Sequence, residues 1–139
     1  MTPLVPSLVS YSDYAALALR VAVGVSLVIH GRMKLGKGAQ QAVQWMKGMG
    51  VPSVATYGAT AIELVGGILL IAGVLVPFAA ALVAVEMLAI IVMKVTKMKA
   101  GYAVQGRPSY EIDVLYLLLS LALMVLGGDF LAIGSAVGL

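Results

Sequence analysis

Apolar residues occur in four long stretches, separated by short segments in which polar residues, glycines and prolines gather. The stretches cover residues 13–35, 53–75, 78–98 and 110–126. Each of them reaches or approaches the ~20 residues that an α-helix needs to cross the hydrocarbon core of a bilayer. Because a membrane span must satisfy its backbone polar groups internally, the pattern predicts four transmembrane helices.

The connector after the first stretch has a different character. Residues 39–49 are short and polar, and they include Trp45. Since an indole ring suits the headgroup region, this segment predicts a short interfacial helix between the first and second spans. The expected fold class is therefore all-α, an integral membrane four-helix bundle, with residues 1–139 forming a single membrane domain.

The composition agrees with a membrane protein. The chain is 62% hydrophobic and only 11% charged, with a mean hydropathy of +1.07. About a quarter of the residues of a typical soluble domain are charged. The net charge of +3 does not point to nucleic acid, because the basic residues flank apolar stretches. We expect membrane lipids around the chain and no nucleic-acid partner.

The basic residues also predict an orientation. They gather at the end of the first span and in the connector that follows it, and again from the end of the third span to the start of the fourth. These two regions lie on the same side of a four-span protein. The residues concerned are Arg32, Lys34, Lys37, Lys47, Lys94, Lys97, Lys99 and Arg107. The positive-inside rule places both regions in the cytoplasm and both termini outside, in the plasma membrane of a prokaryote.

Four ionisable side chains lie at membrane depth, away from the ends of the predicted spans, namely Arg20, His30, Glu63 and Glu86. Counting 1.5 Å per residue along each helix, Arg20 lies at a depth from which it can reach either glutamate. Charged groups inside membranes usually mark a functional site, so the four residues predict a polar pocket for a quinone, a lipid headgroup or a proton. The alternative is a buried ion pair that only fixes helix register, with Glu86 pairing across an interface and His30 in a structural or interfacial role.

Glycines accompany these charges at helical spacing. Glu63 and Gly67 share one face of the second predicted span, and Gly24 and Gly31 share one face of the first with Arg20. Small residues at such positions let helix backbones approach closely in a membrane. We therefore expect each of these faces to pack tightly against a neighbouring helix.

The chain contains no cysteine and a single histidine, His30. Iron–sulfur clusters need several cysteine ligands, and a two-histidine haem or a histidine-rich metal site needs more histidines than the chain has. We expect no haem, metal or iron–sulfur centre in this chain, so a redox role would need electrons from elsewhere.

Several short motifs, taken together in their order and spacing, carry a family resemblance over nearly the whole chain. They are Leu19-Arg20 with Gly24, the run His30 to Leu35, Gly50-Val51-Pro52, the run Glu63 to Gly67 with Gly73, Tyr110-Glu111, and Gly127-Gly128-Asp129. This set resembles the DoxX family of small four-helix membrane proteins, which includes DoxD-like subunits of thiosulfate:quinone oxidoreductases. The resemblance directs attention to Arg20, His30, Lys34, Glu63 and Glu111.

The leading hypothesis from the resemblance is a small membrane subunit of a quinone-linked respiratory or sulfur-oxidising oxidoreductase complex. Such a subunit would anchor the complex and help to line a quinone pocket, acting as an accessory subunit more than as an enzyme alone. Glu86 and the lysines Lys94, Lys97 and Lys99 lie outside the family pattern and could mark contact with other subunits or with further copies of the chain. A non-catalytic scaffold or assembly factor and a small transporter or oligomeric channel remain alternative hypotheses.

The expected orientation can be tested with a reporter enzyme fused after Leu139. We expect the reporter to be active only when it is of the kind that works outside the cytoplasm. Activity of a cytoplasmic reporter alone, at the same expression level, would contradict the orientation.

Overall fold

The computed structural model describes residues 10–127 and 132–138, and its regular elements are all helices. The residues Gly128 and Asp129 of the family resemblance, like most of the N-terminal lead-in, lie outside the described part. In chain order the helices are α2 (Ser12–Met33), α3 (Lys37–Gly48), α4 (Ser53–Ala61), the π-helical turn η1 (Ile62–Gly66), α5 (Gly67–Ala72), α6 (Val76–Lys97), α7 (Glu111–Leu126) and α8 (Ile133–Val137).

Three helices in the described part of the chain are long and apolar enough to cross a membrane. They are α2, the continuous helix Ser53–Ala72 formed by α4, η1 and α5, and α6. These coincide with the first three predicted spans to within a few residues at each end. Helix α7 lies where the fourth span was expected, but its 16 residues are fewer than the ~20 of a full span. The all-α class is confirmed, and the fourth span stays a prediction.

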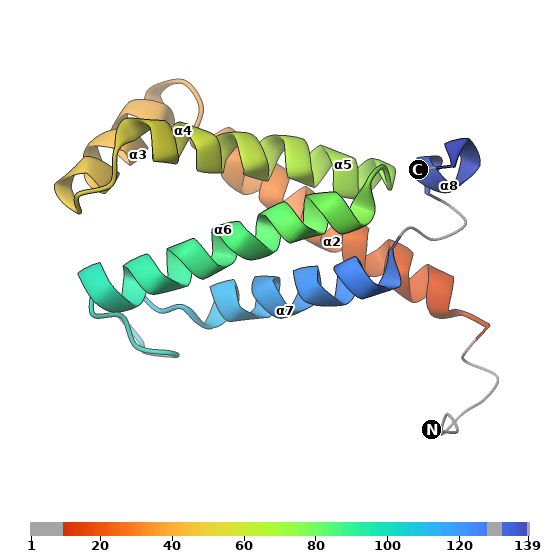
Figure 1. Ribbon diagram of the computed structural model, residues 1–139. Helices are drawn as coiled ribbons and strands as arrows, with labels where there is room; N and C mark the ends of the chain where they lie inside the picture. Colours follow the sequence, from red (N-terminus) through yellow and green to blue (C-terminus); the bar gives the residue numbers. More distant parts are fainter. Residues whose placement is uncertain (1–9, 128–131, 139) are drawn as a thin grey trace.

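The long helices lie side by side (Figure 1). Helix α2 packs against η1, α5 and α7, and α6 packs against α7, η1 and α5. Helix α3 and the loop 98–110 lie at one end of the molecule, while α8 lies at the opposite end (Figure 1). We call the end with α3 and this loop the basic end, because every lysine and arginine except Arg20 belongs to it or to the helix ends that join it.

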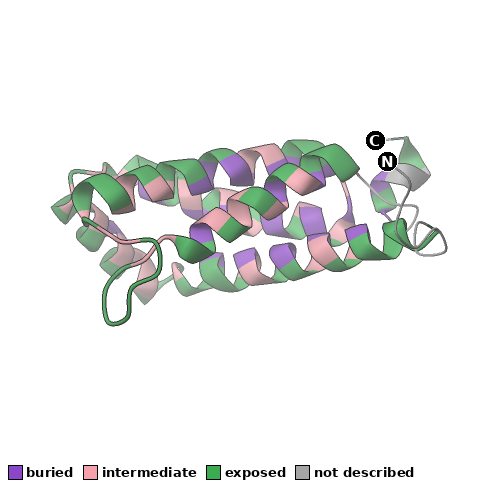
Figure 2. Cartoon of the chain, turned by 90° about the horizontal axis from the view of Figure 1, so that it is seen from below, coloured by how far each residue is buried: buried purple, intermediate pink, exposed green. Residues whose placement is uncertain are grey.

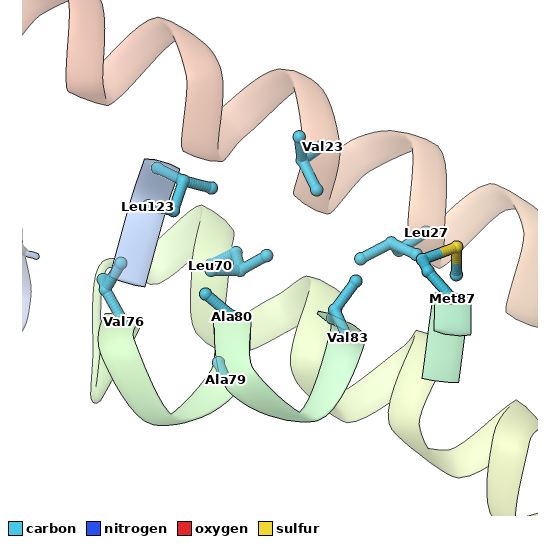
Figure 3. Close-up of a cluster of buried hydrophobic side chains, with 9 residues drawn as sticks. All are labelled: Val23, Leu27, Leu70, Val76, Ala79, Ala80, Val83, Met87 and Leu123. Atoms are coloured by element: carbon cyan, nitrogen blue, oxygen red, sulfur yellow. The ribbon is translucent and has the colours of Figure 1, made fainter. Parts of the chain in front are cut away.

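Buried residues lie on the inward sides of the long helices (Figure 2). The core contains side chains from α2, α5, α6 and α7 (Figure 3). Its members are Val23, Leu27, Leu70, Val76, Ala79, Ala80, Val83, Met87 and Leu123. Because alanines stand opposite larger aliphatic side chains, α6 can lie close to α5 without leaving voids.

Glycines set the distance between α2 and the second long helix. A Cβ on Gly24 would lie 2.6 Å from the carbonyl oxygen of Gly67, and a Cβ on Gly67 would lie 2.8 Å from the carbonyl oxygen of Gly24. A Cβ on Gly31 would lie 2.8 Å from Cγ of Leu64. The two backbones therefore touch at positions where only glycine fits, which confirms the close packing expected from the sequence.

The substitution Gly24→Ala should lower the free energy of unfolding in detergent by about 1–3 kcal/mol, because the new methyl group meets backbone that cannot yield locally. Gly58→Ala is the matched control, since a Cβ there meets nothing within 4 Å and alanine favours the helix. Equilibrium unfolding of both variants measures the effect. Equal stabilities of the two variants would show that the helix crossing does not depend on Gly24.

Candidate functional site

The π-helical turn η1 positions Glu63 inside the molecule. The turn interrupts the second long helix at Ile62–Gly66, and π-helical turns of this kind occur frequently at functional sites. Upstream of it, Thr56 and Thr60 share one face of α4 with Glu63, at spacings of four and three residues. All three side chains are buried, with exposed fractions of 5%, 6% and 4%. A polar face therefore runs from the start of α4 to Glu63.

Lys34 neutralises Glu63. Its Nζ lies 2.7 Å from Oε1 of Glu63, as both a hydrogen bond and an ion pair. Lys34 follows the last residue of α2, and its side chain is 32% exposed whereas that of Glu63 is 5% exposed. The lysine thus reaches from the basic end toward a carboxylate that has no access to solvent of its own.

Glu86 lies on α6, which packs against η1. Its side chain is 5% exposed, and neither carboxylate oxygen has a hydrogen-bond partner in the described part of the chain. The same holds for Oε2 of Glu63. Glu86 interacts electrostatically with both Glu63 and Lys34. We call these three residues the Lys34–Glu63–Glu86 cluster.

Arg20 does not belong to this cluster, so its predicted pairing with Glu63 or Glu86 is wrong. Its guanidinium donates hydrogen bonds to the carbonyl oxygens of Leu70 and Ile71, at 3.1 and 2.6 Å. These carbonyls belong to the last turn of α5, where the helix supplies fewer backbone donors, and the carbonyl oxygen of Leu70 also accepts from the backbone N–H of Gly73 at 3.2 Å. The positive charge also suits the negative end of the helix dipole. Arg20 therefore secures the turn between α5 and α6.

His30 also lies apart from the cluster. Its side chain is exposed on α2, and no described hydrogen bond or ion pair links it to Glu63 or Glu86. Of the four ionisable residues proposed from the sequence, the structure brings together only the two glutamates. Lys34, which the family resemblance contributes, completes the cluster.

An apolar groove runs along α6 toward the basic end. It lies between α6 and the segment Met49 to Val51, has a volume of about 420 Å³, and includes Ala89, Met93 and Lys97 in its lining. These residues follow Glu86 by three, seven and eleven positions, so they share its side of the helix. Leu88, Val92 and Thr96 line the groove too, whereas Glu86 does not, so the groove opens on the more exposed side of α6, next to the face that carries Glu86.

Two further polar contacts were not anticipated from the sequence. Lys94 pairs with Asp113 at 2.6 Å and donates to the carbonyl oxygen of Ser109 at 3.1 Å, which ties the loop and the start of α7 to α6. The hydroxyl groups of Ser26 and Tyr116 share a hydrogen bond between α2 and α7. Both pairs depend on which helices are neighbours, which no local pattern in the sequence specifies.

The chain is similar to a known protein family and to a bacterial protein. The DoxX family profile matches residues 15–96, a range that contains the whole Lys34–Glu63–Glu86 cluster. The protein CatD of Bacillus subtilis (strain 168), whose name describes it provisionally as an oxidoreductase, is 32% identical over 121 residues, which cover 87% of this chain and 85% of CatD. No solved structure matches the chain at a significant level.

A double-mutant cycle should reveal coupling between Lys34 and Glu63. Lys34→Met should lower the free energy of unfolding by about 1–3 kcal/mol, less than the cost of breaking a fully buried pair because Lys34 is partly exposed. In a Glu63→Gln background the same substitution should cost at least about 1 kcal/mol less. Lys47→Met, at an exposed position of α3, serves as the control and should stay within about 0.5 kcal/mol of the unmodified protein. Strict additivity of the two changes would mean that the ion pair does not contribute to folding.

Proposed function

Because the chain belongs to the DoxX family, we propose that it is a small membrane component of a quinone-linked oxidoreductase in a respiratory or sulfur-oxidising complex. The oxidoreductase name of CatD supports a redox role. In this proposal α7 completes a four-helix bundle in the plasma membrane of a prokaryote, and the basic end faces the cytoplasm.

The observation that carries the proposal is the Lys34–Glu63–Glu86 cluster. Buried carboxylates without hydrogen-bond partners are costly, and inside a membrane protein they usually mark a site of binding or proton transfer. Here three such oxygens, Oε2 of Glu63 and both oxygens of Glu86, lie near an ammonium group that is accessible from the basic end. A purely structural ion pair would not need the second glutamate.

The donor set fits the polar end of a quinone. A lysine ammonium group has three N–H donors, and Glu63 accepts one of them, so Lys34 has donors left for a carbonyl oxygen. A quinone, when bound, takes up two electrons and two protons on reduction. The two glutamates would hold protons near the bound group, and the apolar groove along α6 would accommodate its apolar part.

Electrons would come from a partner subunit or a diffusible donor. The chain offers no cysteine and one histidine as ligands for a redox centre of its own. In this arrangement the chain anchors the complex and contributes to its quinone site, and it does not carry out the electron transfer alone. Lipids and other membrane subunits would be its partners.

The substitution Glu63→Gln should lower quinone reduction by at least about tenfold, because it removes a group that can hold a proton at the site while keeping its shape. Turnover would be measured in membranes of the native host lacking the natural gene and complemented with each variant, using a short-chain quinone and equal amounts of protein. Asp13→Asn, which changes an exposed carboxylate at the start of α2, should retain full turnover. Unchanged turnover in membranes that contain Glu63→Gln would show that the cluster takes no part in quinone reduction.

A further inference from the structure

The charges of the Lys34–Glu63–Glu86 cluster do not balance. Glu63 and Glu86 would contribute two negative charges when ionised, and Lys34 contributes one positive charge. The remaining cations near these helices are engaged elsewhere. Arg20 donates to carbonyl oxygens of α5, and Lys94 pairs with Asp113. With both glutamates ionised, the cluster would carry one negative charge that Lys34 does not compensate.

Such a charge is unfavourable at this position. Both glutamates are more than nine-tenths buried, and they interact electrostatically with one another. A buried carboxylate that lacks a partner usually becomes neutral instead of remaining ionised. A carboxylic acid also provides an O–H donor, where the described residues offer none to Oε1 and Oε2 of Glu86.

We propose that Glu63 and Glu86 together bind one exchangeable proton, which balances the cluster against the single positive charge of Lys34. The proton belongs to the pair, because carboxyl groups that interact gain and lose protons as a pair and not as separate residues. This deepens the proposed function, since it identifies the group that would deliver a proton to a bound quinone.

The polar face of α4 provides the route by which the proton arrives. Thr60 Oγ1 donates to the carbonyl oxygen of Thr56 at 3.0 Å, and Oγ1 of Thr56 has no hydrogen-bond partner in the described part of the chain. Hydroxyl groups both donate and accept hydrogen bonds, so they can pass protons along with water. The face begins near Ser53, at the basic end, and leads to Glu63. The proton therefore enters from the basic end.

Infrared spectroscopy of the purified full-length chain at neutral pH tests whether the two glutamates share one proton. The unmodified protein should show the carbonyl stretch of one buried carboxylic acid. Both Glu63→Gln and Glu86→Gln should abolish this band, because each variant leaves one carboxylate opposite Lys34. Lys34→Met should double the band, because both glutamates must then be neutral.

The rate at which this band shifts in D₂O tests the route. Thr60→Val should slow the exchange several-fold, whereas Ser12→Ala, a change of an exposed hydroxyl at the start of α2, should leave the rate unchanged. Equal exchange rates in the two variants would overturn the route along α4.

Either of two results would overturn the proposal that Glu63 and Glu86 share a proton. The first is the absence of the band in the unmodified protein. The second is a band that persists in both glutamine variants. Because no quinone or partner is present, these results are independent of turnover. If the infrared bands are as expected but the turnover of Glu63→Gln is unchanged, the proposed function is rejected and the shared proton is retained.

Discussion

The ion pair between Lys34 and Glu63 is the interaction on which the polar interior depends. A carboxylate in an apolar helix bundle costs several kcal/mol unless a cation meets it with good geometry. Lys34 provides that cation from the end of α2, at 2.7 Å. The pair therefore joins the basic end of the first span to the middle of the second. Glu86, on α6, adds a second carboxyl group near the same lysine, which already pairs with Glu63. The site can therefore take up one further positive charge.

Close packing of two backbones makes this ion pair possible. Gly24 and Gly67 let α2 and α5 touch, and a Cβ on Gly31 would lie 3.2 Å from Cβ of Glu63. Larger residues at these positions would move α2 away from η1 and take Lys34 out of reach of the carboxylate. The glycines thus set the distance between the two helices, and this distance determines which charged side chains can meet inside the protein.

The helices could be predicted because each apolar stretch has the length and composition of a span, and the burial of Glu63 and Glu86 could be predicted because a charge in a span avoids lipid. The partner of Glu63 could not. Counting depth along regular helices placed Arg20 within reach, but it ignored the carbonyls of Leu70 and Ile71, which accept from its guanidinium at the end of α5. Lys34 was counted among the basic residues that set the orientation, although its long side chain extends inward to Glu63. Nothing in the local sequence signals the π-helical turn that presents Glu63.

We propose that this chain works within a redox complex and holds a quinone at the Lys34–Glu63–Glu86 cluster. Native mass spectrometry of the particle, extracted from its own membrane in a mild detergent, is the decisive test. We expect the chain to be found together with oxidoreductase subunits at fixed stoichiometry, and with a bound quinone that is lost when Glu63 is replaced by glutamine. A chain that arrives alone or only with copies of itself, without a quinone, would contradict it.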